Sequence, residues 1–542
     1  GGHAMSTHIL TWLLLIPLIG ALMVLAIPRS REGTIRGFSI AVMLVELVLS
    51  LRLLWADYST PGYRFIEQVA WVESLGISYK VGVDGLSLWL VLLTTALTPI
   101  ALYASWGSIT TRIKEYAFSF LLLELGMMGA FVALDLFLFY VFWELMLVPM
   151  YLIIGVWGGK DRVYAAMKFF LYTFVGSLLM LVAILYIVAT YKELTGQYTF
   201  DLEKLTTLLL PAVPQYLLFS AFAVAFAIKI PMFPFHTWLP DAHVQAPTGG
   251  SVILAAVLLK FGIYGFIRFA MPLFPVASQV IGPTLAGLGV FGIIYGAYAA
   301  WVQRDLKKLV AYSSVSHMGF ILLGLFAMNR NGVSGAILQM INHGVSTGAL
   351  FILVGVIYDR RHSRMLDDFG GLAKVMPWYA TIFVIITMSS IGVPGTNGFV
   401  GEFMILAGAF FSRGPVGFGN YWFVMTLLAA TGVIFAAVYM LHAVLRMFWG
   451  KVTHEENESL PDLNRREAWA LIPLVALVFW IGLYPKFFLD KMDPAVDAFI
   501  TDFNIRYQQS RGISKPRLAD LQAIDPEESG SYAFAPYMEE GR

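Results

Sequence analysis

Ala227-Ile228-Lys229-Ile230-Pro231-Met232-Phe233-Pro234 interrupts a long apolar run with one lysine and two prolines. A second apolar run is interrupted by Ile391-Gly392-Val393-Pro394-Gly395-Thr396-Asn397-Gly398. Proline removes a backbone donor and clashes with the preceding turn, so each stretch predicts a broken helix. Within a membrane, freed backbone groups are tolerated where they line a polar cavity, and paired broken helices indicate an ion site. The sequence therefore predicts such a site beside Pro231 and beside Pro394 and Gly395.

The composition requires lipid as the solvent for most of the surface. Of the 542 residues, 58% are hydrophobic and 13% are charged, whereas soluble domains carry about 25% charged residues. The net charge of +1 and the lack of a basic stripe exclude nucleic acid as a partner. The sequence contains no cysteine, which excludes disulfides, thiolate zinc sites and iron–sulfur ligation by this chain.

The apolar runs predict an all-α polytopic membrane protein with about 14 transmembrane helices of about 20 residues each. The two interrupted runs are the seventh and twelfth predicted spans, so they lie five spans apart. This spacing predicts two five-helix repeats, spans 4–8 and 9–13, which are inverted because each holds an odd number of helices. Asp135 and Asp305, which open the fifth and tenth spans, are a second sign of the repeat.

These spans divide the chain into five predicted segments. We expect the first three spans in residues 1–115, the first repeat in 116–271, the second repeat in 272–450, the last span in 451–490 and a polar extramembrane tail in 491–542.

Lysine and arginine are concentrated in every second loop, which predicts that those loops face the cytoplasm. With an even number of spans, both termini face the periplasmic side of a bacterial inner membrane. The basic loops contain Arg29, Arg31, Arg36, Arg112, Lys114, Lys160, Arg162, Arg304, Lys307, Lys308, Arg360, Arg361 and Arg364.

Several ionisable residues lie within the apolar spans, where a charged side chain costs roughly 2.5–3.5 kcal/mol on insertion scales. Lysine, glutamate and histidine can each accept and release a proton, so a series of them across the membrane predicts proton transfer. The candidates are Glu144, Lys229, Lys260, Glu402, His317 and His343, with Lys168 as a weaker one.

Each candidate also has a structural interpretation. Glu144 and Lys229 can form a static ion pair between two helices, although buried pairs seldom add stability. Lys260 can extend its ammonium to the membrane surface, and Glu402 can cap the second half-helix. The two histidines can simply hydrogen bond to neighbouring helices.

His236 and His243 flank a short polar stretch that follows the first break. We expect no metal site there, because Pro240 breaks helical spacing and further ligands do not cluster. A re-entrant loop at the mouth of a half-channel, with His236 as a proton relay, is the preferred interpretation. Phosphate-binding loops, dinucleotide-binding glycine patterns and catalytic triads are absent from the sequence, so we expect this chain to bind no cofactor and to perform no redox chemistry.

Three stretches resemble signature sequences of the antiporter-like subunits of respiratory complex I. They are residues 142–151 (FWELMLVPMY), 236–243 (HTWLPDAH) and 313–320 (SSVSHMGF). The resemblance implies a core of 14 helices with two inverted repeats and a proton path along a central polar axis. Residues 398–403 (GFVGEF) resemble the M type, because the L and N types and the Mrp antiporter subunits usually carry lysine where this chain has Glu402.

By the same resemblance, Glu144 is the partner of Lys229, and Lys260 is the central lysine of the path. His317 and His343 correspond to a polar bridge from Lys260 toward the outlet. These roles are what the resemblance implies for residues that the spans had already singled out.

The expected function is that of a proton-translocating membrane-arm subunit of NADH:quinone oxidoreductase. NADH, FMN, iron–sulfur clusters and quinone then belong to partner subunits, and L-like and N-like antiporter subunits, lipids, water and protons surround this chain. Two alternatives stay open: a subunit of an Mrp-type cation/H⁺ antiporter, and the equivalent subunit of a ferredoxin- or hydrogenase-linked relative of complex I.

Overall fold

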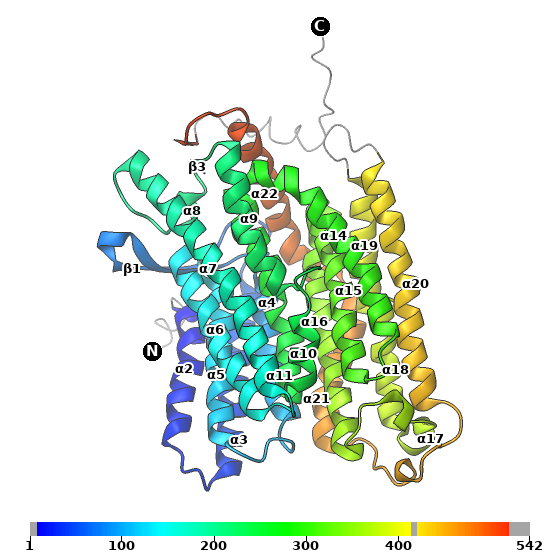
Figure 1. Cartoon of the computed structure of the whole chain (residues 1–542). Helices are drawn as coiled ribbons and strands as arrows, with labels where there is room; N and C mark the ends of the chain where they lie inside the picture. The colour runs from blue at the N-terminus through cyan, green and yellow to red at the C-terminus, as the bar shows by residue number, and fades with distance from the viewer. Residues whose placement is uncertain (1–7, 413–419, 520–542) are drawn as a thin grey trace.

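The computed structural model describes residues 8–412 and 420–519, which form a bundle of helices running side by side (Figure 1). In these residues, twelve helices are long and apolar enough to cross a membrane, and three apolar helices are shorter. The predicted class, an all-α polytopic membrane protein, is confirmed. The count of fourteen spans stays a prediction.

The first half of the chain contains most of the short elements. In order, it consists of α2 (Ile9–Ala26), α3 (Glu32–Ser50), η1 (Leu51–Trp55), β1 (Arg64–Val72), η2 (Glu73–Leu75), β2 (Ile77–Val83), α4 (Leu88–Ala104), α5 (Ile113–Val132), α6 (Leu136–Trp157), α7 (Arg162–Thr195), α8 (Leu202–Leu205), β3 (Leu208–Leu209), α9 (Ala212–Lys229), α10 (Trp238–Gln245), α11 (Thr248–Ile253), η3 (Leu254–Leu258), α12 (Lys260–Gly265), η4 (Phe266–Ala270) and α13 (Met271–Leu273).

Longer helices dominate the second half of the chain. It consists of α14 (Pro275–Trp301), α15 (Leu306–Phe326), α16 (Arg330–Arg361), η5 (Leu366–Asp368), α17 (Leu372–Val375), α18 (Pro377–Ile391), α19 (Asn397–Phe411), α20 (Tyr421–Phe448), η6 (Glu455–Asn457), α21 (Arg465–Leu483), α22 (Lys486–Ser510) and β4 (Arg517–Leu518).

Burial separates central from peripheral helices. The apolar parts of Thr248–Leu273 and of α16 are 100% buried, whereas those of α3, α20 and α21 are 33% buried. The peripheral helices therefore present apolar side chains outward, as lipid requires. A polar side chain on a central helix must find its partners within the protein.

Pro231 explains the first helix break, which follows α9. Because Pro231 has no N–H to give to Ala227 O, Met232 N donates to that carbonyl instead, at 2.7 Å. The shift leaves Ile228 O without its helical donor, and Trp238 Nε1 donates to it at 2.8 Å. The freed backbone is thus satisfied inside the protein, and the predicted break is confirmed.

Two glycines make the second break, which separates α18 from α19. Gly392 and Gly395 have φ angles of +88° and +95°, a region that favours glycine because it has no Cβ. Gly392 N and Val393 N both donate to Met388 O, at 3.1 and 3.0 Å, and this closes the end of α18. The second predicted break is also confirmed.

A β-hairpin near the N-terminus was missed by the sequence analysis. Strands β1 and β2 pair antiparallel, from Arg64 opposite Val83 to Val72 opposite Ile77. Lys80 on β2 reaches the loop after α7, where its Nζ lies 3.0 Å from Asp201 Oδ2. The signal was present in the β-branched and aromatic residues of both strands, but an all-helical interpretation left no place for them.

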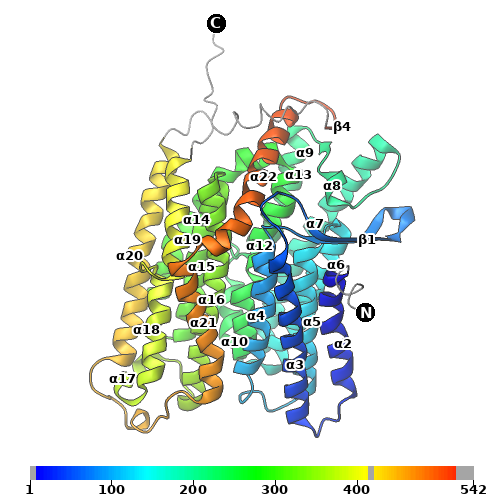
Figure 2. The same cartoon turned by 180° about the vertical axis from the view of Figure 1, so that it is seen from behind.

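Helix α22 follows the last predicted span and packs across the outer parts of α13, α14 and α16 (Figure 2). The predicted boundary between segments 451–490 and 491–542 therefore falls inside this helix. Residues 520–542 of the predicted tail lie outside the described residues. The hydrogen bonds between α22 and the transmembrane helices include Trp89 Nε1 to Phe488 O (3.0 Å) and Ser334 Oγ to Asp493 Oδ1 (2.6 Å).

Arg360 at the end of α16 provides a test of how the bundle is held together. Its guanidinium donates to both carboxylate oxygens of Glu467 on α21, at 2.7 and 2.6 Å, and both side chains are at most 9% exposed. Replacing Arg360 with Ala strands a buried carboxylate, so we expect a loss of about 3–5 kcal/mol of stability. Thermal unfolding of the purified protein in detergent measures it.

Glu456→Ala is the matched control, because Glu456 pairs with Arg361 at 3.6 Å while 66% exposed. Its loss is expected to cost at most about 1 kcal/mol. Equal unfolding midpoints for the two variants would contradict the conclusion that the buried Arg360–Glu467 ion pair stabilises the contact between α16 and α21.

Candidate functional site

Lys260 occupies the middle of a helix that is fully buried and locally widened. The π-helical segments η3 and η4 flank α12, and such segments are frequent at functional sites. The Lys260 side chain is 0% exposed, and its Nζ lies 2.6 Å from Ala255 O and 2.5 Å from His343 Nδ1. This central placement excludes the interpretation in which Lys260 extends to the membrane surface.

The two histidines continue the series from Lys260 toward the second helix break. His343 Nε2 lies 3.1 Å from Ser314 Oγ, and its ring centre is 5.5 Å from that of His317. His317 Nε2 lies 3.1 Å from Ser390 Oγ, and its Nδ1 lies 3.8 Å from Glu402 Oε1. The structure thus brings together four of the predicted residues in one line.

A small cavity fills the space between the histidines and the second break. Its volume is about 10 Å³, which is close to the minimum for one water molecule. The described hydrogen bonds include none between the two imidazoles, and a single water in this cavity can bridge them. The cavity is lined by His317, Gln339, Asn342, His343, Ser346, Thr347, Ser389, Ser390 and Gly398.

The second break supplies the polar lining of this cavity. Ser346 Oγ lies 2.5 Å from Ser389 Oγ, and Ser389 in turn donates to the amide oxygen of Asn397. Asn342 Nδ2 donates to Asn397 O at 2.8 Å. Hydroxyl and amide groups therefore surround the histidines on the side where the helix is interrupted, as a proton path requires.

Glu402 ends the line, and a glycine makes room for it. The carboxylate lies against Gly392, where a Cβ would contact it directly. Among the described hydrogen bonds, no backbone N–H of α19 donates to Glu402, and the N-cap of α19 is Thr396 without a side-chain cap. Glu402 is therefore directed toward His317 rather than acting as a helix cap.

Lys229 and Glu144 are not in contact in this conformation. Lys229 is 1% exposed, and its Nζ has no hydrogen-bond acceptor among the described residues. The ammonium lies 5.0 Å from the centre of the Trp143 ring and 5.9 Å from that of Phe169, so aromatic faces stabilise it. Glu144 Oε1 is likewise unpaired in the described part of the chain, which argues against a static ion pair.

Lys168 and His236 lie beside the first break and are held by other partners. Lys168 Nζ forms an ion pair with Asp241 Oδ2 at 2.8 Å, and His236 Nε2 lies 2.9 Å from Tyr295 Oη. The expected re-entrant loop is partly wrong, because residues 238–245 form helix α10. Pro240 sits in its first turn, where a missing backbone donor costs nothing.

His243 is a candidate that the sequence analysis did not single out for proton transfer. It is 0% exposed, neither ring nitrogen has a hydrogen-bond partner among the described residues, and it stacks on Phe351 with ring centres 4.4 Å apart. The two residues that follow it line a cavity of about 690 Å³ on the basic side, where Lys307 Nζ donates to Ala246 O at 2.6 Å. The proximity of His243 to this cavity depends on the fold and could not be read from the sequence.

Comparisons with known proteins agree on one family. The family described as "NADH:quinone oxidoreductase/Mrp antiporter, TM" matches residues 133–434, which is more than half of the chain. NADH-quinone oxidoreductase subunit M from Rhodobacter capsulatus is 45% identical over 509 residues, or 92% of this chain and 97% of that protein.

Solved structures agree on the fold. A chain in respiratory complex I from Thermus thermophilus with bound NADH has a TM-score of 0.81 and 31% identity, and the match covers 91% of this chain and 99% of that chain. A chain of the Mrp complex from Dietzia sp. has a TM-score of 0.75 and 24% identity, with 96% of this chain and 54% of that chain covered. The second likeness shows a shared fold alone.

Gly392 provides a test of the Glu402 position. In Gly392→Ala, the new Cβ meets the Glu402 carboxylate, so we expect Glu402 to be displaced from His317 and the rate of proton translocation by membranes to fall severalfold. Gly395→Ala imposes the same kind of backbone strain, about 1–2 kcal/mol, but meets no atom within 4 Å. Equal translocation by the two variants at equal stability would contradict the steric role of Gly392.

Proposed function

The chain belongs to the NADH:quinone oxidoreductase/Mrp antiporter family, and we propose that it is the M-type proton-translocating subunit in the membrane arm of a bacterial NADH:quinone oxidoreductase. The observation that carries this proposal is the line formed by Lys260, His343, His317 and Glu402 across buried helices. Static packing gives no reason to place a lysine, two histidines and a glutamate in series at the centre of a membrane protein.

The central transfer runs from lysine to histidine. The Lys260 ammonium is placed to give its proton to His343 Nδ1 over 2.5 Å, and the resulting imidazolium can pass a proton from Nε2 toward the serine-lined cavity. His317 then takes the proton and delivers it to Glu402, 3.8 Å from its Nδ1. Each group in the series can both accept and release a proton, as a relay requires.

Lys229 is the loading site for this series and Glu144 is its gate. Because Lys229 Nζ lacks an acceptor in the described conformation, approach of the Glu144 carboxylate would favour the charged lysine and its withdrawal would favour proton release. Lys168 and His236 hold the first break in place through Asp241 and Tyr295, and they offer weaker sites for proton uptake.

The driving energy comes from outside this chain. Moving one proton against the membrane potential costs about 2.3 kcal/mol per 100 mV. NADH, FMN, iron–sulfur clusters and quinone are placed on partner subunits, and the L-like and N-like antiporter subunits are the expected neighbours. The subunits that co-purify distinguish this complex from a ferredoxin- or hydrogenase-linked relative.

Matching helix starts support two inverted repeats, residues 116–271 and 272–450, within a core of fourteen spans. Asp135 caps α6 and forms a β-bridge with Asp201, while Asp305 caps α15 and forms a β-bridge with Met365. The basic loops then face the cytoplasm and both termini face the outside of a bacterial inner membrane.

Lys229→Met tests the loading role, because methionine keeps the length of the side chain and cannot carry a proton. We expect NADH-driven proton pumping by membrane vesicles to fall at least severalfold, with the complex still assembled. Glu144→Gln is expected to have the same effect, since the gate loses its charge. Lys192→Met, at the exposed end of α7, is the matched control. Full pumping by an assembled Lys229→Met complex would refute the assignment.

A subunit of an Mrp-type cation/H⁺ antiporter is the second candidate, supported by the shared fold and disfavoured by Glu402. The two candidates differ in their response to sodium or potassium. We expect NADH to acidify vesicles without either cation, whereas an antiporter would dissipate an imposed pH gradient when the cation is added without NADH. A fluorescent pH indicator inside the vesicles measures both, and cation-dependent dissipation would favour the antiporter.

A further inference from the structure

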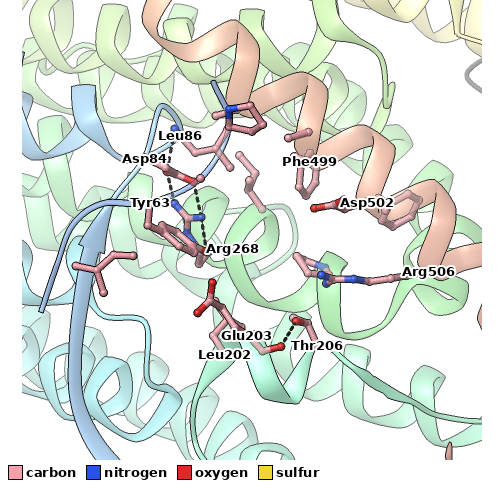
Figure 3. Close-up of a pocket in the computed structure, with 18 residues that line it drawn as sticks. Tyr63, Asp84, Leu86, Leu202, Glu203, Thr206, Arg268, Phe499, Asp502 and Arg506 are labelled. Atoms are coloured by element: carbon pink, nitrogen blue, oxygen red, sulfur yellow. Dashed lines mark hydrogen bonds and ion pairs between the residues drawn. The ribbon is translucent and has the colours of Figure 1, made fainter. Parts of the chain in front are cut away.

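A second polar region lies beside α8 and β1, at the end of the molecule opposite the basic loop between α2 and α3 (Figure 1). Figure 3 shows it in close-up. It is a cavity of about 310 Å³, bounded by the loop before β1, by α8, by η4 and by α22. Glu203 and Asp502 are exposed, so the cavity is accessible to water. Its charged lining residues are Asp84, Glu203, Arg268, Asp502 and Arg506.

Arg268 forms the inner wall of this cavity, and every nitrogen of its guanidinium donates a hydrogen bond. Its Nη1 and Nη2 donate to the two carboxylate oxygens of Asp84 at 2.8 and 2.6 Å, and Nη1 also donates to Tyr63 Oη at 3.2 Å. Its Nε donates to Tyr264 Oη at 3.1 Å. Arg506 lies on the opposite side of the cavity, on α22 (Figure 3).

Arg268 and Lys260 belong to the same buried transmembrane segment. Residues 260, 264 and 268 recur every fourth position and so lie along one face of the helix, with Arg268 about 12 Å beyond Lys260. Tyr264 stands between them and donates to Phe131 O at 2.7 Å. From the cavity inward, Arg268 and Tyr264 therefore precede the central lysine of the proton path.

Arginine differs chemically from every other member of the polar series. Its guanidinium has five donors and no acceptor, and it does not give up its proton in proteins. Lysine, histidine, glutamate, serine and tyrosine can each pass a proton along a hydrogen-bonded chain, but such a chain stops at a guanidinium.

We propose that the Arg268–Asp84 ion pair is a plug that keeps protons in the outer cavity from returning to Lys260. The inference rests on the proposed function only in that Lys260 is taken to carry protons. During turnover the proton concentration is high on the outer side. A water-filled cavity two helical turns from Lys260 would therefore let protons leak back to Lys260, unless a group that cannot relay protons lies between the cavity and the lysine. Asp84 keeps the guanidinium in that position by a bidentate pair.

Passive proton conductance is the first test. The complete complex with Arg268→Gln is reconstituted into vesicles, and the decay of an imposed pH gradient is followed without NADH. We expect decay several times faster than with the wild type, because glutamine can donate and accept hydrogen bonds and admits water. Arg506→Gln, on the opposite wall, is the matched control and leaves the decay unchanged. Wild-type decay with an assembled Arg268→Gln complex overturns the proposal.

Cysteine labelling is the second test and does not depend on activity. The sequence contains no cysteine, so Lys260→Cys introduces a unique thiol in this chain. A membrane-impermeant methanethiosulfonate added outside spheroplasts is expected to leave it unmodified while Arg268 is present, and to modify it when Arg268→Gln is combined with it. Asp502→Cys, at the cavity rim, is the positive control. Equal modification of the residue-260 thiol in both backgrounds overturns the plug.

Asp84→Asn is the alternative variant if the complex with Arg268→Gln does not assemble. Asparagine has nearly the same volume as aspartate but cannot form the ion pair that holds the guanidinium. It is expected to raise both the passive conductance and the labelling of Lys260→Cys. The proposed function and the plug are tested by different measurements. NADH-driven pumping by Lys229→Met tests the proton relay, and its passive conductance is expected to be normal. Conductance measured without NADH in the Arg268 and Asp84 variants tests the plug alone.

Discussion

Every polar group inside a bilayer must find its partner within the protein, because lipid offers none. The structure follows from this constraint at both helix breaks. At the first, Met232 N replaces the donor that Pro231 lacks, and Trp238 donates to the carbonyl of Ile228 that this shift leaves free. At the second, Asn342 donates to the backbone carbonyl of Asn397, and Ser389 donates to its side-chain amide oxygen. The same constraint places the titratable side chains together, since a lone charge among apolar helices is too costly to retain.

The two central lysines satisfy this constraint in different ways. Lys260 has a carbonyl and an imidazole within hydrogen-bond distance, so its proton has a defined acceptor. Lys229 has aromatic faces around its ammonium and no hydrogen-bond acceptor among the described residues. Lys260 is thus held by two directional contacts, whereas Lys229 is held by ring faces.

Much of this arrangement was predictable from the sequence, because local chemistry determines it. Hydropathy identified the helical membrane class, proline and glycine located the two breaks, and intramembrane charges identified the four side chains that the structure brings into one line. Long-range placement was not predictable: Arg268 and Asp84 are 184 positions apart, and the sequence contains no sign that they meet. His243 was mentioned only as one end of a polar stretch, since its burial beside Phe351 depends on the packing of α10 against α16. The hairpin of β1 and β2 was overlooked because an all-helical interpretation left no place for the β-branched and aromatic residues of its strands.

Helix α22 has a mechanical consequence for the molecule. Asp493 ties its first half to Ser334 on α16, the helix that carries His343. Its second half provides Asp502 and Arg506 to the outer cavity. Pro494 lies between these two contacts and removes one backbone hydrogen bond from α22. The helix that carries His343 and the rim of the outer cavity are thus connected through one helix with a built-in weak point next to its tie to α16.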